Sequence, residues 1–245
     1  MIFYEYEKYN RNKIYSMNFP YKLIDLTHAL DSAIPTWDGG CGFNHDMHID
    51  YADCKGADKF RVMKVTMHAG IGTHMDAPSH CIAQGRCIHD FDVNDLIMPC
   101  VVIDVSSQCH ERYSLSGQDV VDFESKYGKI AVGACVFVKT GWSKFWNTPL
   151  QYHNNHVFPS VSADAAELLL ERGVHAIGID TLSPDRPEDG FNVHKAFLGA
   201  DKIILENVAN LDSMPPTGSL CLVLPIKIKD GTEAPVRLVG LIEVG

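Results

Sequence analysis

The residues best suited to chemistry gather in residues 68–81, which read HAGIGTHMDAPSHC. His74 and Asp76 are two positions apart, so in an extended segment both side chains project from the same face. Imidazole nitrogen and carboxylate oxygen are ligand types that hold zinc or manganese while leaving a position open for water. His68 and His80 flank this pair. The pattern therefore indicates a metal site, although isolated histidines also occur widely on protein surfaces and in cores.

Two residues later in the chain strengthen this interpretation. Glu206 interrupts the apolar run KIILENV, where a buried carboxylate is costly unless a cation or a hydrogen-bond donor satisfies it. His194 lies twelve residues earlier, in a short segment with helical character. A structural salt bridge would satisfy Glu206 as well as a metal would. Asp180, which ends the run VHAIGID, has the same ambiguity, and structural hydrogen bonding is its expected role.

Short runs rich in Val, Ile and Phe dominate the chain and predict strands. These runs cover residues 22–27, 60–67, 100–105, 134–140, 174–180, 202–208, 220–229 and 236–244. Helices are expected over residues 116–127, 162–172 and 193–198, the second with Ser162 as its N-cap. Strands and helices do not alternate regularly, which argues against a doubly wound fold. We expect an α/β domain with mixed sheets, a β-barrel-like centre and outer helices.

The composition limits the kinds of partner. The chain has 245 residues and a formal net charge of −10, which argues against nucleic acid or an anionic membrane surface as a partner. No stretch approaches the ~18 apolar residues of a membrane span, and the first residues lack the features of a secretory signal. The eight cysteines form no CxxC pair, which favours reduced thiols in a cytoplasmic protein. We expect residues 1–19 to form an N-terminal arm and residues 20–245 a single domain.

Several of these segments together resemble a known family. GTHMDAPSH, at residues 72–80, closely resembles the HxGTHxDAPxH signature of the cyclase family of metal-dependent hydrolases, which includes bacterial kynurenine formamidases and isatin hydrolases. IDLT with Pro35 and Trp37 resembles the N-terminal block of that family, and ERGVHAIGIDTLSPD resembles its central block. ILENVANLD, with His194 and Glu206 twelve apart, matches its later ligand pair. The resemblance covers roughly residues 22–245.

The resemblance implies a swivelling β/β/α fold around a metal centre, often binuclear, that would hold one or two zinc or manganese ions. Carried over by position, the metal ligands would be His74, Asp76, His194 and Glu206. His80 would be the catalytic acid/base, and Trp37 would line the substrate pocket. Relatives are usually homo-oligomers, so the resemblance also implies a dimer or a tetramer.

One position departs from the family's pattern. The first histidine of the signature falls on Gly70, so a ligand to the first metal is absent unless another residue replaces it. His68, two residues upstream, and Cys81, next to His80, are the nearby donors that could fill this gap. Without a replacement, the site would hold one ion or a weakened pair.

The chemistry implied is hydrolysis of the C–N bond of a small amide, arylformamide or cyclic amide by a metal-activated water. His80 would deliver a proton to the leaving nitrogen, which is a poor leaving group unless protonated. The gap at Gly70 leaves an alternative open. In that alternative, the chain is a degenerate member of the family that binds a small ligand or a partner without turnover. A serine or cysteine hydrolase is disfavoured because the chain has no G-x-S-x-G motif.

Overall fold

A closed sheet of seven strands forms the centre of the molecule. The computed structural model describes residues 19–244, so all but Phe19 of the arm expected over residues 1–19 lies outside the described residues. In spatial order the sheet consists of β12 (Glu233–Glu243), β11 (Ser219–Pro225), β5 (Ile97–Asp104), β7 (Cys135–Lys139), β9 (Ala176–Ile179), β10 (Ile203–Glu206) and β4 (His74–Asp76). β4 pairs with β12 as well as β10, which closes the ring, and β1 (Tyr21–Asp25) pairs with β12 outside it.

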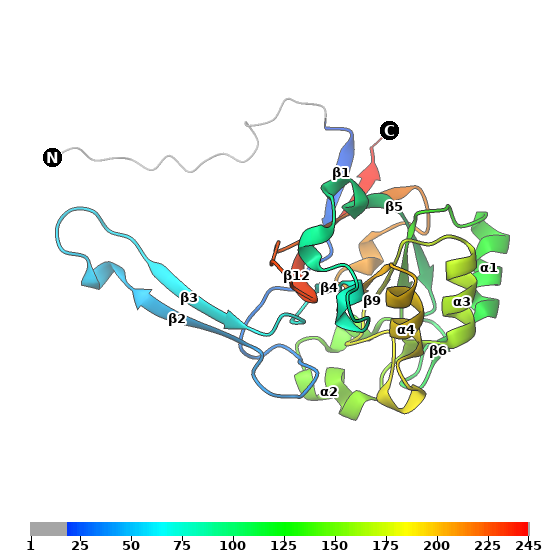
Figure 1. Ribbon diagram of the computed structural model, residues 1–245, viewed down its shortest axis with the longest axis horizontal. Coiled ribbons are helices and arrows are strands. Elements are labelled where there is room, and N and C mark those ends of the chain that lie inside the picture. Colours follow the sequence, from blue (N-terminus) through cyan, green and yellow to red (C-terminus); the bar gives the residue numbers. More distant parts are fainter. Residues whose placement is uncertain (1–18, 245) are drawn as a thin grey trace.

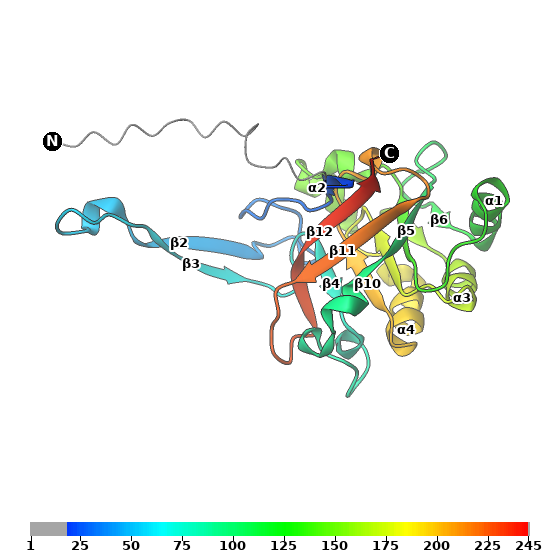
Figure 2. The same cartoon turned by 90° about the horizontal axis from the view of Figure 1, so that it is seen from above.

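The sheet is mixed, as expected. Neighbours from β5 through β7 and β9 to β10 run parallel, whereas β11, β12 and β4 pair antiparallel. Parallel neighbours need crossover connections, and these carry the helices α1 (Gly117–Tyr127), α3 (Ala163–Glu171) and α4 (Asn192–Gly199). The three helices lie together on one side of the barrel (Figures 1 and 2). The expected fold class, with a barrel-like centre and outer helices, is confirmed.

Both faces of the parallel strands are buried, which explains their unbroken apolar sequences. Along β5, Cys100 and Val102 belong to the core inside the barrel, whereas Val101 and Ile103 belong to the core beneath the helices. Adjacent residues of a strand point to opposite faces, so both sets have to be apolar. A third, smaller core contains Trp142, Trp146 and Phe158, which pack with other apolar side chains that include Ile34 and Phe43.

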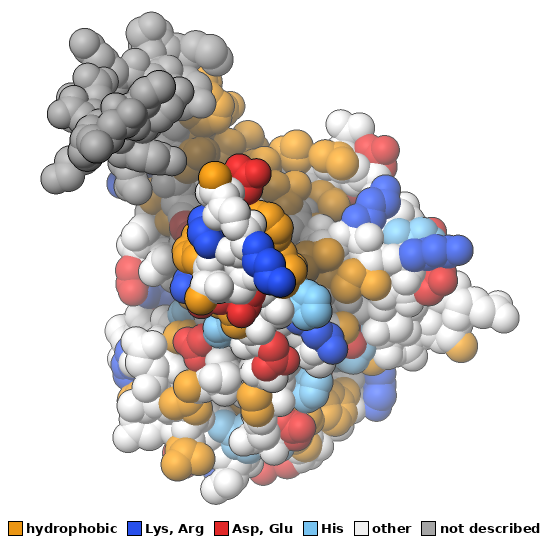
Figure 3. Space-filling view, turned by 90° about the vertical axis from the view of Figure 1, so that its left-hand side faces the viewer, with side chains coloured by type: hydrophobic (Ala, Val, Ile, Leu, Met, Phe, Trp, Pro, Cys, Tyr) orange, Lys and Arg blue, Asp and Glu red, His pale blue; other side chains and the backbone are white. Residues whose placement is uncertain are grey.

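A two-stranded hairpin projects from this body (Figure 1). It comprises β2 (Phe43–Ile49) and β3 (Val62–Met67). Figure 3, viewed from the side on which the hairpin projects, shows hydrophobic side chains around it. Exposed apolar residues of the hairpin and its loop are Met47, Tyr51, Phe60, Val62, Met63 and Val65. The structure also contains the strand pair β6 (Ser114–Leu115) and β8 (Ser160–Val161) and the short helix α2 (Pro149–His153).

The helix predictions are confirmed to within two residues, and Ser116 and Ser162 cap α1 and α3 through their side chains. Two strand predictions need correction. The strand predicted over 220–229 ends at Pro225, since the following residues turn. The strand predicted over 236–244 already begins at Glu233. That earlier start is important for the site, because it brings the first residues of β12 beside β4.

Two further findings concern the cysteines and possible membrane spans. All eight cysteines are unpaired in the structure. Among residues 19–244, no helix combines the length and apolar character that crossing a bilayer requires.

Candidate metal centre

The site is built on β4, the short strand that closes the barrel. In the antiparallel pairing with β10, His74 lies opposite Glu206, and in the pairing with β12, Asp76 lies opposite Glu233. Residues directly opposite each other in antiparallel strands share one face, so one imidazole and three carboxylates gather on the same side of the sheet. Met75, between the two β4 residues, points into the barrel core instead.

The four ligands implied by the resemblance converge in space. His74 Nε2 lies 3.4 Å from Asp76 Oδ1 and 3.3 Å from Glu206 Oε2. His194, from α4, places its Nε2 3.7 Å from Asp76 Oδ2 and 3.6 Å from Glu206 Oε1. Asp76 thus stands between the two histidines, with one oxygen toward each. Segments more than a hundred residues apart in the chain meet here.

Each histidine is oriented by its other ring nitrogen. His74 Nδ1 lies 2.8 Å from the backbone carbonyl of Gly72, which leaves Nε2 free to face the carboxylates. His194 Nδ1 lies 2.7 Å from Asp185 Oδ2, and the same carboxylate accepts hydrogen bonds from the backbone N–H groups of Val193 and His194. Such partners fix the tautomer and ring orientation of metal-ligating histidines. Asp185 therefore also belongs to the site.

The donor set fits a divalent cation. Both carboxylate oxygens of Asp76 and Oε1 of Glu206 are buried without a hydrogen-bond partner. Burial raises the pKa of Glu206, and the nearby charge of Asp76 raises it further. For Asp76, burial also raises the pKa, but His74 and His194 outweigh it and lower the pKa overall. Buried carboxylates without partners are costly, and a metal ion with nitrogen and oxygen ligands would satisfy them.

His80 stands beside this cluster without belonging to it. It ends the 3-10 turn η2 (Pro78–His80), which begins at the proline that stops β4 from continuing. Its side chain is 33% exposed, and its ring centroid lies 5.8 Å from that of His194. Its Nδ1 is 3.4 Å from Glu233 Oε2. Glu233 raises the pKa of His80, while partial burial lowers it to a smaller extent.

The cluster forms one side of a cavity of about 420 Å³. Apolar residues that line this cavity include Pro35, Trp37, Leu182 and Phe191. The Trp37 ring packs against His156 and Phe191, with centroid distances of 4.3 and 5.9 Å. Its backbone carbonyl lies 2.9 Å from His153 Nε2 and 2.7 Å from His156 Nε2, which fixes the segment that carries it. The cavity therefore combines polar donors with an aromatic wall.

The donors considered for the gap at Gly70 lie apart from the cluster. His68 lines the cavity, but it is exposed and belongs to none of the three groups of close donors found among the described residues. Cys81 is also exposed and outside all three groups. Instead, Glu233 groups with His74 and Asp76, their ligand atoms lying within 4.8 Å of one another. Sequence reasoning missed Glu233, since TEAP carries no local motif.

Asp180 has the structural role expected for it. Its Oδ1 accepts hydrogen bonds from the backbone N–H and the hydroxyl of Thr140, at 2.8 and 2.7 Å. Its Oδ2 accepts from the N–H of Gly141 at 2.9 Å. Because both oxygens are occupied by donors of the loop after β7, Asp180 fixes that loop and offers no oxygen to a metal.

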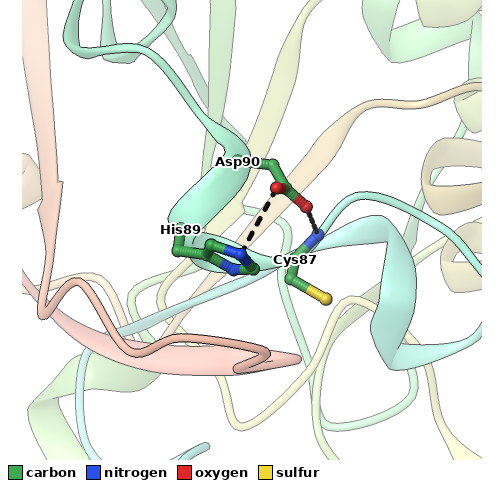
Figure 4. A group of neighbouring side chains, drawn as sticks. All are labelled: Cys87, His89 and Asp90. Atoms are coloured by element: carbon green, nitrogen blue, oxygen red, sulfur yellow. Dashed lines mark hydrogen bonds and ion pairs between the residues drawn. The ribbon is translucent and has the colours of Figure 1, made fainter.

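Another group of donor-type residues, Cys87, His89 and Asp90, lies outside the cavity (Figure 4). Asp90 Oδ2 accepts a hydrogen bond from the Cys87 N–H at 2.8 Å, which caps a single 3-10 turn. His89 Nδ1 accepts from the N–H of Asp230 at 3.0 Å. Turn capping and loop contacts thus account for this group.

Comparisons with known proteins identify the relatives of this chain. The family model described as "Putative cyclase" matches residues 24–186. An isatin hydrolase of Roseibium aggregatum is 31% identical over 187 residues, covering 70% of this chain and 71% of that protein. A kynurenine formamidase of Bacillus cereus is 29% identical over 217 residues, covering 88% of this chain and 95% of that one.

A solved structure gives the same result. Isatin hydrolase A from Labrenzia aggregata, bound to benzyl benzoate, superimposes with a TM-score of 0.81 at 26% sequence identity, over 92% of this chain and 95% of that chain. The fold, the signature residues and the family match agree along most of the described chain. This chain therefore belongs to the cyclase family.

Proposed function

We propose that the protein is a metal-dependent hydrolase that cleaves the C–N bond of a small amide, arylformamide or cyclic amide. The observation that carries this proposal is the set of buried, unpartnered carboxylate oxygens of Asp76 and Glu206 facing two oriented histidines at the cavity. Relatives named isatin hydrolase and kynurenine formamidase support a C–N bond of this kind as the target.

His74, Asp76, His194 and Glu206 would hold one or two divalent ions, zinc or manganese. A divalent ion bound there supplies an activated water and polarises the substrate carbonyl. The chain's own contribution is to fix the donors: Gly72 orients His74, and Asp185 orients His194. Because the cluster is buried, few water molecules would screen the charge of an ion bound there.

His80 would act as the acid/base. It lies next to the donor cluster, keeps part of its ring exposed to solvent and is held at Nδ1 by Glu233. A residue in this position can exchange protons with water and deliver one to the departing nitrogen. An ordinary histidine, with a pKa near ~6.5, transfers protons in both directions at neutral pH. Glu233 raises the pKa of His80 above that value, which favours the protonated form that donates a proton to the leaving nitrogen.

Trp37 would line the substrate site. Together with Phe191 and Leu182 it gives the cavity an apolar wall opposite the donors. Such a wall would pack against an aromatic ring, and the related isatin hydrolase A structure contains the aromatic ester benzyl benzoate. An aryl-substituted amide or formamide is therefore the preferred substrate class within the proposal.

The decisive experiment combines metal quantification with a hydrolysis screen. Purified protein is loaded with Zn²⁺ or Mn²⁺, freed of excess ion and assayed with N-formylkynurenine, isatin and simple cyclic amides. Turnover that depends on bound metal supports the proposal. A protein that stays metal-free after loading, or a loaded protein that is inert toward all three classes, would instead favour the non-catalytic ligand-binding alternative.

Three further predictions belong to this proposal. Free cysteines support a reducing, cytoplasmic location. The exposed apolar side chains of the β2–β3 hairpin support a homo-oligomer, dimer or tetramer, which light scattering can measure. The division into an arm over residues 1–19 and one domain over residues 20–245 can be checked by limited proteolysis.

A further inference from the structure

The space in front of Gly70 is already filled by a carboxylate. An ideal Cβ built on Gly70 would lie 2.3 Å from Glu233 Oε1, far closer than two such atoms can approach, and 3.3 Å from His74 Nε2. A side chain at position 70 and the present position of Glu233 are therefore mutually exclusive. Position 70 is also where the family signature carries its first histidine, and here that residue is glycine.

Glu233 reaches this space because of the strand pairing. Its backbone lies opposite Asp76 at the start of β12, so its side chain points to the same face as the other carboxylates. Its two oxygens have different neighbours. Oε1 lies in the space before Gly70 and His74, whereas Oε2 lies 3.4 Å from His80 Nδ1 and accepts a hydrogen bond from Thr232 Oγ1 at 3.2 Å.

The donors then divide into two groups that share one residue. His74, Asp76 and Glu233 form one group of three close ligand atoms, and Asp76, His194 and Glu206 form the other. Asp76 is common to both, and each of its oxygens is buried without a hydrogen-bond partner. A carboxylate that is shared in this way can bridge two cations.

We propose that Glu233 replaces the missing histidine as a metal ligand, so that this chain binds two divalent ions with Asp76 between them. This inference rests on the proposed metal centre and specifies how its gap is filled. Gly70 and Glu233 act as a matched pair: the absence of a side chain at one position makes room for the donor from the other. Because a carboxylate takes the place of an imidazole, the ion on this side has harder, oxygen-rich ligands, which suit manganese.

The test counts the ions bound per chain, and this measurement does not depend on enzymatic turnover. Protein is loaded with MnCl₂, passed through a desalting column and analysed for metal content, and a calorimetric titration with Mn²⁺ counts the sites independently. We expect two ions in the wild type and one in Glu233→Ala. The double variant Gly70→His/Glu233→Ala, which restores the histidine in the vacated space, should bind two ions again. Its matched control, Gly70→Ala/Glu233→Ala, should bind one.

Two further variants separate ligation from the contact with His80. Glu233→Gln keeps the shape of the side chain but offers a weaker ligand. It should lower the affinity for the second ion at least about tenfold. His80→Ala removes the imidazole that contacts Glu233 Oε2, and this variant should still bind two ions. If His80→Ala loses the second ion as Glu233→Ala does, Glu233 acts through His80 and the inference is wrong.

The outcomes also distinguish this inference from the proposed function. One ion in both the wild type and Glu233→Ala, or two in both, overturns the role of Glu233 and leaves the metal-dependent hydrolase intact. A wild-type chain that binds no ion under any loading condition overturns both. Circular dichroism of each variant establishes that a lost ion reflects a lost ligand rather than a lost fold.

Discussion

Asp185 Oδ2 lies 2.7 Å from His194 Nδ1, and the same side chain accepts hydrogen bonds from the backbone N–H groups of Val193 and His194 in the first turn of α4. One buried carboxylate therefore fixes both the helix that carries the histidine and the rotation of its ring. The negative charge also lies at the positive end of the helix dipole, which favours this placement. His194 can face the donor cluster only while this arrangement holds.

Asp185→Asn should weaken metal binding about 10- to 100-fold, the loss typical when the partner of a ligating histidine is changed. Asparagine can still accept one of the two backbone N–H groups through its single side-chain oxygen, so the helix keeps part of its cap and the fold should be retained. The measurement is a competition titration against a chelator. Asp189→Asn, which changes an exposed carboxylate four residues away, is the control and should bind metal as the wild type does. Equal affinities in the two variants would show that Asp185 has no part in metal binding.

His80→Ala should keep its metal content while turnover falls by about 10²- to 10⁴-fold, because proton delivery to the leaving nitrogen is lost. Metal analysis and steady-state kinetics on the same preparation check both parts. His48→Ala, which alters an exposed histidine of the hairpin, should change neither. If His80→Ala loses all of its metal, His80 is a ligand and its assigned role is wrong.

Glu206→Gln should have opposite effects on the metal-free and metal-loaded protein. Without metal, the change removes a buried carboxylate beside Asp76, so the melting temperature should rise by a few degrees. With metal, the variant should lose most of the stabilisation that ion binding gives the wild type. Differential scanning calorimetry with and without Mn²⁺ measures both. Equal metal-induced stabilisation in the variant and the wild type would contradict the assignment of Glu206 as a ligand.

Acid should destabilise the fold through His28. Burial of this ring, which stacks on Trp146 at 3.8 Å, lowers the pKa of His28 from 6.5 to about 4. The unfolded chain then binds a proton between pH ~6.5 and ~4 that the folded chain does not, so folding stability falls as pH falls through that window. The loss has an upper limit of about 3 kcal/mol, which partial solvent exposure reduces to roughly 1–2 kcal/mol.

His28→Phe keeps an aromatic ring against Trp146 but removes the titration. Urea unfolding of metal-free protein at pH 7 and pH 4.5 measures the effect, and the variant should lose less stability between these values than the wild type. A chelator keeps the protein metal-free at both pH values, so pH-dependent release of metal does not contribute, and the remaining titrating groups are the same in the variant and the wild type. An identical loss in both proteins would exclude His28 as a source of the pH dependence.

Asp180→Ala should destabilise the protein without emptying the metal centre. The change leaves the N–H groups of Thr140 and Gly141 without their acceptor, at a cost of about 1–3 kcal/mol for each buried group. Chemical denaturation together with metal analysis checks this. A stable variant that has lost its metal would mean that Asp180 is part of the site after all.

Much of the protein follows from local sequence. Runs of apolar residues predict the parallel strands because both of their faces are buried, and Ser116 and Ser162 mark helix starts because their hydroxyls cap free N–H groups. His74 and Asp76 stand out because their spacing of two puts them on one face of a strand. The predicted strand over 220–229 overshot, because the apolar Ile226 and Ile228 lie in the loop between β11 and β12, which the apolar pattern does not distinguish from a strand.

The sequence by itself determined the family and the gap at Gly70, and it predicted the residue types of the metal ligands. Only the tertiary structure decided what lies in that gap. Glu233 has no motif around it and is 163 positions from Gly70, and it reaches the site only because β12 pairs with β4 to close the barrel. Register between strands distant in the chain depends on the closure of the whole sheet rather than on local residue preference. For the same reason, the meeting of Glu206 with His74 became visible only in the folded chain.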